Sequence, residues 1–316
     1  MTGSDQFILS SNQFEAAYLR LHRSGELAAR AEMATAALEK CCVCPRNCGT
    51  NRLAGFCGTC KTSRLAVVSS AFPHMGEEGC LRGRRGSGTI FFAGCSLRCV
   101  FCQNFEISHS SQGQEVSAAE LAGMMLSLQE AGCHNINLVT PDHFVPQILA
   151  ALDIAAGNGL GLPIVYNTSG YTSLLALGWL DGVVDIFMPD FKTADPAEAH
   201  LYMQAKDYPQ VAEIAIREMH RQVGDLVLDE NGIALRGLLV RHLVMPEDVS
   251  SAELVMQKLA AISPDTFLNI MGQYRPDHKV LTDERYNRIN RRPRQDEIIK
   301  AYETAREAGL WRFDPH

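Results

Sequence analysis

Three closely spaced cysteines are the residues of this sequence best suited to chemistry. Cys95, Cys99 and Cys102 form a C-x3-C-x2-C run directly after the apolar stretch 89–93, which is typical of a buried strand. As thiolates they suit a soft metal site, either zinc or iron–sulfur. Three ligands leave one metal position open, as a catalytic metal site does for its substrate. The alternatives are a zinc site or three reduced cysteines in the core.

A second cysteine-rich segment lies at residues 41–60. It holds six thiols, where four would complete a tetrathiolate site for zinc or for an auxiliary iron–sulfur cluster. The predicted ligands are Cys41, Cys44, Cys48 and Cys60, with Cys42 and Cys57 as possible substitutes. Spacing alone does not decide between zinc and iron, and a set of reduced cysteines without metal is the other interpretation. Cys80, further along the chain, has no predicted role.

Apolar strand candidates alternate with helical patterns from residue 88 onward. The predicted strands are 89–93, 135–140, 163–168, 184–189, 237–244 and 267–271. The predicted helices are 117–131, 143–157, 172–180, 195–223 and 248–262, the first of them opened by a capping box of Ser117 and Glu120. Such alternation predicts a parallel sheet with right-handed crossovers. Six units fall short of the eight of a closed barrel. The predicted fold is therefore α/β, a partial (βα)6 TIM-like barrel with an N-terminal helical and cysteine-rich segment.

Four segments are expected along the chain. Residues 1–40 form an N-terminal helical arm with a break at Ser24-Gly25, and residues 41–86 form the cysteine-rich metal-binding segment and a connector with a short strand near 65–68. Residues 87–275 form the partial barrel. Residues 276–316 form a C-terminal extension with an amphipathic helix at 295–310.

Composition points to a globular protein outside the membrane. The chain has 316 residues, 46% of them hydrophobic and 21% charged, and its net charge of −7 disfavours broad nucleic-acid or anionic-membrane binding. No apolar stretch reaches membrane-spanning length, and the start lacks a basic segment followed by an apolar one. Eleven cysteines in such a chain favour metal sites over disulfides, so we expect a cytoplasmic metalloprotein with no clear nucleic-acid signal.

Polar residues follow each predicted strand, where catalytic groups of parallel α/β folds gather. The three cysteines follow the first predicted strand. The stretches at the ends of the second to sixth strands are Thr140-Pro141-Asp142-His143, Asn167-Thr168-Ser169, Asp190-Phe191-Lys192, Arg241-His242 and Gln273-Tyr274. Chance would rarely place polar groups at every unit of one rim. The sequence therefore predicts a single site at the carboxyl ends of the strands.

The cysteine spacing resembles the cluster motif of the radical S-adenosylmethionine (SAM) enzymes. The order of the other motifs is similar to that of the activating enzymes of glycyl-radical enzymes, and most of all to pyruvate formate-lyase activating-like proteins. The resemblance rests on a Cys-Pro-Arg-x-Cys segment at 44–48, G-S-G-T-I-F-F at 86–92, C-Q-N at 102–104, Y-N-T-S-G-Y at 166–171 and M-P-D-F-K at 188–192. It extends from about Cys41 to Tyr274.

The resemblance implies roles for individual residues. It makes Cys95, Cys99 and Cys102 the ligands of a 4Fe–4S cluster whose fourth iron binds SAM, and it places Phe101 against the adenine. The residues implied to bind SAM or a nearby monovalent cation are Asn167, Thr168, Ser169, Met188, Asp190 and Lys192. Lys192 would pair with the SAM carboxylate, and His242 would lie near that carboxylate and the substrate. Asn167 replaces an aspartate of the family.

A second departure concerns the SAM amino group. The G-G-E-P stretch that holds it in the family is absent, and Thr140, Pro141 and Asp142 stand at that place. Either Thr140 with neighbouring carbonyl groups or the Asp142 carboxylate could accept hydrogen bonds from the amine. The structural alternative is that Asp142 caps the next helix. In the same way, Asp190 and Lys192 could form a plain salt bridge.

The resemblance also implies a mechanism and its partners. A donor such as flavodoxin or ferredoxin reduces the cluster, SAM is cleaved to methionine and a 5′-deoxyadenosyl radical, and the radical takes a hydrogen atom from the substrate. That substrate is a glycyl-radical enzyme in one interpretation and a small molecule, peptide or RNA in the second. The N-terminal cysteines do not resemble the ferredoxin-like insert of many activating enzymes. A third interpretation is a non-catalytic metal-binding interaction protein.

Overall fold

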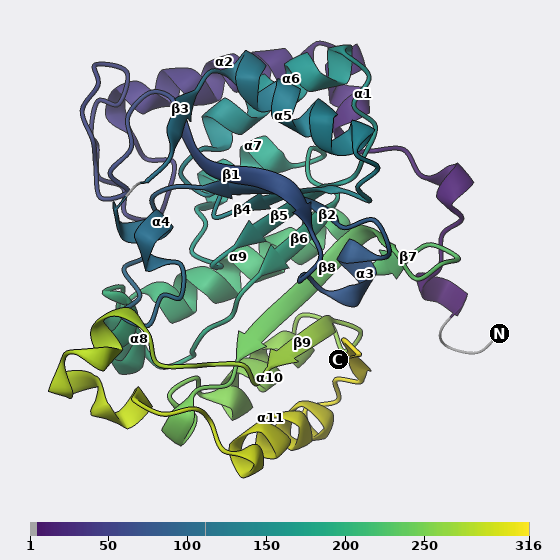
Figure 1. Cartoon of the computed structure of the whole chain (residues 1–316). Coiled ribbons are helices and arrows are strands. Elements are labelled where there is room, and N and C mark those ends of the chain that lie inside the picture. Colours follow the sequence, from purple (N-terminus) through teal and green to yellow (C-terminus); the bar gives the residue numbers. More distant parts are fainter. Residues whose placement is uncertain (1–4, 111, 316) are drawn as a thin grey trace.

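A single sheet with a parallel centre organises the chain (Figure 1). The computed structural model describes residues 5–110 and 112–315. The six predicted strands are confirmed with small shifts in their bounds: β2 (Ser87–Phe92), β4 (Ile136–Val139), β5 (Ile164–Thr168), β6 (Ile186–Pro189), β8 (Ala234–Leu243) and β9 (Phe267–Met271). They lie side by side in that order and all run parallel. The sheet does not close, so the fold is the predicted partial barrel.

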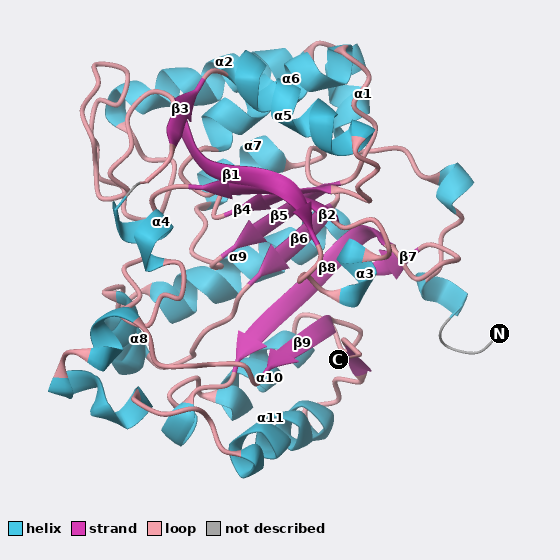
Figure 2. Cartoon of the chain, in the orientation of Figure 1, coloured by secondary structure: helices cyan, strands magenta, loops and turns pink. Residues whose placement is uncertain are grey.

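The parallel strands are apolar because both of their faces are covered. Every residue of β5 and of β6 is buried, as expected for strands with helices on one side and the barrel interior on the other. Figure 2 shows the strands at the centre of the molecule with helices around them. The parallel order brings the carboxyl ends of the strands to one edge of the sheet, where the predicted site residues begin.

The helices between the strands follow the predicted pattern with one correction. The helices near their predicted places are α5 (Ala118–Glu130), α6 (Val145–Gly157), α7 (Leu174–Leu180) and α10 (Ala252–Ala260). The capping box is confirmed, because the Glu120 amide donates to the Ser117 hydroxyl and the Glu120 carboxylate accepts from the Ser117 amide. The single helix predicted at 195–223 is instead two, α8 (Pro196–Met203) and α9 (Tyr208–Val223). Gln204, in the left-handed conformation with φ 54°, ends α8.

The antiparallel edge of the sheet is larger than the sequence indicated. The short strand expected near 65–68 is β1 (Ala66–His74), which pairs antiparallel with β2 and with β3 (Gln114–Val116). The short helices α3 (Gly79–Arg82) and α4 (Phe105–Ser110) follow β1 and the cysteine loop. At the other side, β7 (Val227–Leu228) pairs with β8, and β10 (Arg312–Phe313) pairs with β9. The connector and the C-terminal extension therefore both contribute strands to the same sheet.

The two ends of the chain pack on the outside of the barrel. The N-terminal arm contains α1 (Tyr18–Arg23) and α2 (Glu26–Ala36), with the predicted break at Gly25, whose φ is 77°. Helix α2 lies beside α6 in Figure 1, and the Ala17 amide donates to the buried Asp185 carboxylate at 2.9 Å. The C-terminal helix is α11 (Gln295–Glu307), shorter than predicted. Residues 1–4, on which the expected lack of an N-terminal signal partly depends, lie outside the described residues.

Short 3-10 helices complete the described structure. They are Asp5–Phe7, Ser11–Gln13, Ala37–Lys40, Pro246–Asp248, His278–Leu281 and Glu284–Ile289. In the described part of the chain, no helix combines the length and the apolar character that a membrane crossing requires.

Gly94 connects the cysteine loop to the N-terminal cysteine-rich segment by close backbone contact. Its φ is 79°, and a Cβ at this position would lie 2.5 Å from the Cys60 carbonyl oxygen. Only glycine combines that conformation with that approach. The loop of Cys95 therefore packs directly on the backbone of Cys60 and the side chain of Thr62.

We predict that Gly94→Ala lowers the stability by about 1–3 kcal/mol, because the new Cβ meets backbone that has no room to move. Gly123→Ala on α5 is the matched control, since no atom lies within 4 Å of its Cβ position. The control should gain about 0.5–1 kcal/mol. Thermal unfolding under anaerobic conditions measures both, and equal midpoints for Gly94→Ala and the unsubstituted chain would contradict the close contact.

Candidate functional site

A cavity of about 260 Å³ lies at the carboxyl ends of the parallel strands. Cys95, Cys99 and Cys102, together with Phe101, line it from the loop after β2. The other predicted site residues in its lining are Thr140 after β4, Asn167, Thr168 and Ser169 at the end of β5, and Asp190 and Lys192 after β6. The fold therefore brings together residues spread over about a hundred positions of sequence.

The three cysteines are free and close to one another. All eleven cysteines of the chain are unpaired thiols. Burial is the main cause that raises the pKa of Cys99 to about 12, and Cys102 is a lesser one. Burial also raises the pKa of Cys95, with smaller contributions from Cys99 and Cys102. The Cys102 sulfur lies 3.1 Å from the Ser108 hydroxyl. Without a metal the Cys95 and Cys99 thiols stay protonated at neutral pH, so a bound metal is what would make them ligands.

The donor set of this cavity suits an iron–sulfur cluster. Three thiols line the cavity, and its lining in the described residues holds no fourth cysteine and no histidine. A structural zinc site has four protein ligands, usually cysteine and histidine. Three thiolates around a cavity would fit a 4Fe–4S cluster with one iron left for another ligand.

Asp190 is the centre of a buried chain of charges beside the cysteines. Its carboxylate accepts from Lys192 Nζ at 2.5 Å and from Arg241 Nε at 2.8 Å. Arg241 Nη2 donates to Asn167 Oδ1 at 2.6 Å. Burial alone would raise the pKa of Asp190, but the two cations outweigh it and hold the pKa below its ordinary value. The predicted salt bridge of Asp190 with Lys192 is therefore present, and both residues still line the cavity.

Tyr208 fixes the backbone that carries this chain of charges. Its hydroxyl is placed to donate to the carbonyl oxygens of Ser169 and Asp190, each at 2.9 Å, and it accepts from the Lys192 amide. Tyr208 is fully buried at the start of α9. The Tyr208 side chain thus connects the loops after β5 and β6 by hydrogen bonds.

Asp142 is a structural residue and does not line the cavity. Its carboxylate accepts from the hydroxyls of Thr168 at 2.6 Å and Thr172 at 2.5 Å, and it is 1% exposed. It also does not cap α6, whose N-cap is Phe144. Thr140 does face the cavity, in a left-handed conformation with φ 58°. Of these two residues, only Thr140 therefore lines the cavity.

The prediction for His242 needs correction. His242 is fully buried, its Nδ1 lies 2.8 Å from the Phe191 carbonyl oxygen, and it is absent from the cavity lining. Successive residues of a strand point to opposite faces, so Arg241 faces the cavity and His242 faces away. Arg241 is the functional candidate that sequence reasoning missed. The signal that could have found it is its place beside His242 at the carboxyl end of a predicted strand.

The N-terminal cysteines lie beside the cysteine loop. Cys41, Cys44 and Cys60 are buried and Cys48 is exposed, and Cys44 lies near both Cys41 and Cys60. Burial is the main cause that raises the pKa of Cys44 to about 12. Arg46 Nε donates to the Ser96 carbonyl at 2.8 Å, and Arg98 donates to the Thr59 carbonyl, so the two cysteine segments are joined in both directions.

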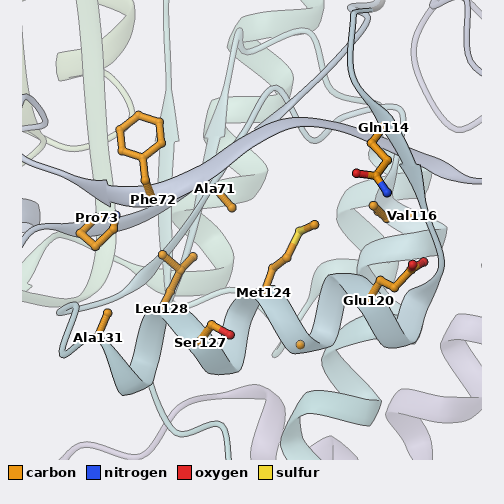
Figure 3. A pocket seen from close by; sticks show the side chains of 11 residues that line it. Ala71, Phe72, Pro73, Gln114, Val116, Glu120, Met124, Ser127, Leu128 and Ala131 are labelled. Atoms are coloured by element: carbon orange, nitrogen blue, oxygen red, sulfur yellow. The ribbon is translucent and has the colours of Figure 1, made fainter.

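An apolar groove of about 550 Å³ between β1 and α5 has no catalytic character (Figure 3). Phe72, Met124 and Leu128 line it, and its one ionisable lining residue, Glu120, belongs to the capping box of α5. The chemistry of the described residues is therefore concentrated at the cysteine-lined cavity.

Comparison with known proteins agrees with this site. A model of the Radical SAM superfamily matches residues 89–230, which begin in β2 and include the three cysteines. An uncharacterized protein of Methanocaldococcus jannaschii is 30% identical over 291 residues, which cover 89% of this chain and 78% of that protein. This chain belongs to the radical SAM superfamily. Membership in the radical SAM superfamily implies a 4Fe–4S cluster and SAM, and the three free thiols at a cavity fit such a cluster.

We predict that Asp190→Asn costs about 3–5 kcal/mol, because it leaves Lys192 and Arg241 as buried cations without their carboxylate. Since the pKa of Asp190 is lowered in the folded chain, its stabilisation is present above the unfolded pKa and is lost as the pH falls through the folded value. The difference between variant and parent in thermal unfolding should therefore shrink in acid.

Asp296→Asn is the control for this substitution, since Asp296 forms only an exposed ion pair with Arg294. A deficit of Asp190→Asn that matched this control, or that grew in acid, would contradict the proposed role of Asp190.

Proposed function

We propose that this radical SAM protein is an enzyme that removes a hydrogen atom from an organic substrate, with Cys95, Cys99 and Cys102 as the cluster ligands. The observation that carries the proposal is the cavity itself, where three free thiols face the polar ends of five other strands. When bound, the reduced cluster supplies the electron that cleaves SAM to methionine and a 5′-deoxyadenosyl radical, which takes the hydrogen atom. A low-potential donor such as flavodoxin or ferredoxin fits the need for that electron.

The residues around the thiols would bind and orient SAM. Lys192 is the cation available to the SAM carboxylate, and Asp190 holds its ammonium group in place from 2.5 Å. Thr140 and adjacent carbonyl groups accept from the amino group. Phe101, 6% exposed and held edge-on by Tyr274 at 6.1 Å, offers its ring to the adenine.

Arg241 accounts for the family's missing aspartate at Asn167. The related activating enzymes have a monovalent cation near this position, whereas here the Arg241 guanidinium contacts both Asn167 and Asp190. A fixed positive charge of the chain thus lies where the resemblance implied a bound ion. The Asn167 side chain suits this guanidinium, because its oxygen accepts a hydrogen bond from Arg241 while Asp190 already supplies the carboxylate.

Two substrate classes are proposed for this radical chemistry. A glycyl-radical enzyme partner is one hypothesis from the motif resemblance, and a small molecule, peptide or RNA is the other. The superfamily match extends to residue 230 only and does not separate them. Genes for a glycyl-radical enzyme beside this one would favour the first.

We further propose that Cys41, Cys44, Cys48 and Cys60 bind a second metal centre, either zinc or an auxiliary cluster. Support comes from Arg52, which is 0% exposed. It donates to the carbonyl oxygens of Ser63 and His143, and its Nη2 has no partner among the described residues. Its Nη1 lies 3.9 Å from the Cys41 sulfur. Because a buried guanidinium is costly without a counter-charge, thiolates held by a metal at this position would supply it.

The first test of the function is electron paramagnetic resonance of anaerobically reconstituted, reduced protein. We predict a 4Fe–4S signal that changes when SAM is added, and its loss when Cys95, Cys99 and Cys102 are all replaced by alanine. Cys133→Ala is the control, because Cys133 is a buried thiol away from the cavity. A SAM-responsive signal that persists in the triple variant, or a signal of the parent that ignores SAM, would reject the assignment.

The same triple variant tests the N-terminal site. We predict that it keeps about one equivalent of zinc or one auxiliary cluster, and that adding Cys41→Ala and Cys44→Ala removes it. Metal analysis by mass spectrometry measures both. A triple variant free of zinc and iron would contradict the second centre.

A further inference from the structure

The cysteine-lined cavity continues into a larger and more polar one. The second cavity measures about 640 Å³ and holds none of the cysteines. The residues that line both are Gln103, Asn104, Val139, Asn167, Arg241, Met271 and Gln273. The two cavities therefore form one cleft, with an inner half at the thiols and an outer half beyond Arg241.

The antiparallel edge of the sheet supplies the wall of the outer half. His74 at the end of β1, Glu77 and Glu78 in the turn that follows, and Arg82 of α3 all line it. Asn269 of β9 lies on the other side. These residues lie outside the motifs that carried the superfamily resemblance.

Glu78 is buried and only partly satisfied. The residue is 7% exposed, and its Oε1 accepts from Asn269 Nδ2 at 2.9 Å and lies 4.0 Å from Arg241 Nη1. Its Oε2 has no hydrogen-bond donor among the described residues, and neither does Asn269 Oδ1 have one. Buried acceptors without a donor are rare in proteins because their desolvation is costly. Two such acceptors on one cavity point to a ligand that donates hydrogen bonds.

The cleft is also short of positive charge. Its carboxylates belong to Glu77, Glu78, Asp190 and Asp314, and its permanent cations are Arg82, Lys192 and Arg241. Two of those cations, Lys192 and Arg241, bind Asp190 at 2.5 and 2.8 Å. The one histidine, His74, has its Nδ1 3.7 Å from Glu77. The four carboxylates of the cleft therefore exceed its three permanent cations by one charge.

The excess of carboxylates favours the protonated form of Glu77. Burial, and then the neighbouring Glu78, raise the pKa of Glu77 to about 7, although Arg241 acts against them. A proton held by two buried carboxyl groups is exchangeable for any other cation that fits.

We propose that the outer half of the cleft binds a protonated nitrogen group of the substrate, an ammonium or guanidinium, between Glu77 and Glu78. The inference rests on the proposed radical SAM function, since it names the substrate class of that same cleft. Such a group donates to Glu78 Oε2 and Asn269 Oδ1 and supplies the missing positive charge. A free amine and a lysine or arginine side chain of a peptide carry the same chemistry.

The test is calorimetry on anaerobically reconstituted protein with SAM present. The free probes are agmatine and cadaverine, with 1,5-pentanediol as the uncharged match and glutarate as the anion. Acetyl-Gly-Arg-Gly-amide and acetyl-Gly-Lys-Gly-amide are the peptide probes. We expect at least one cationic probe to bind about tenfold more tightly than pentanediol. Tighter binding of the peptides would identify a protein substrate, and tighter binding of the free amines a small molecule.

Glu78→Gln should weaken the cationic probe about tenfold, because the pocket loses a charge but keeps its shape. Glu115→Gln, an exposed residue of β3 outside the cleft, is the control with the same charge change. Iron content shows whether Glu78→Gln is folded. In the parent, the cation should bind more tightly at about pH 8 than at about pH 6, since proton and ligand compete for Glu77.

Equal binding of pentanediol, stronger binding of glutarate, or an unchanged affinity in Glu78→Gln would overturn the inference. Electron paramagnetic resonance on the same samples separates this failure from failure of the proposed function. A cluster that responds to SAM while no cation binds would reject only the substrate class. Cation binding without any SAM response would reject the radical mechanism and leave the cation site standing.

Discussion

The contact between Asp190 and Arg241 is the interaction on which the site depends. It joins the end of β6 to β8, where an isolated backbone bridge between the same two residues continues the pairing. The guanidinium then reaches Asn167 at the end of β5, so one side chain spans three neighbouring strands. Because the ions are largely removed from water, each is tolerable only in the presence of the others. The positions of Lys192 and of the cleft walls follow from this mutual requirement.

Around this contact, neutral hydrogen bonds make the rim rigid. Asp142 holds Thr168 and Thr172, and Tyr208 holds the backbone of the two following loops. Burial is the main cause that raises the pKa of Asp142 to about 6, while the hydroxyls of Thr168 and Thr172 act against it. None of these groups needs to touch a ligand. They fix the positions of the side chains that contact the ligand, and radical chemistry requires those positions to be precise.

Sequence reasoning found the parallel core and the cysteine loop because both are encoded locally. Fully apolar strands such as 186–189 and a C-x3-C-x2-C run need no knowledge of distant residues. The C-terminal half of β1 was missed because it is largely exposed and contains Pro73, so its sequence pattern resembles that of a loop. The split between α8 and α9 depends on a single left-handed residue, Gln204, whose identity is not distinctive.

The errors within the site arose where tertiary contacts decide the role of a side chain. Asp142 looked like a ligand or a cap, and its two threonine partners lie 26 and 30 residues away. His242 and Arg241 are adjacent in sequence, and only the orientation of β8 tells which of them faces the cavity. Glu77 and Glu78 gave no sequence signal at all, because their importance comes from Asn269 and Arg241 on other strands.

The arginines that join the two cysteine segments have a consequence for access to the thiols. Arg46 and Arg98 bond to main-chain carbonyls of the opposite loop, and Gly94 packs on the Cys60 carbonyl between them. Neither loop can open by itself without breaking these contacts, so the two behave as one unit of local unfolding. An oxidant or a chelator that reaches the buried thiols of one segment has therefore already loosened the other. Damage at the two sites should accumulate together, as a single event.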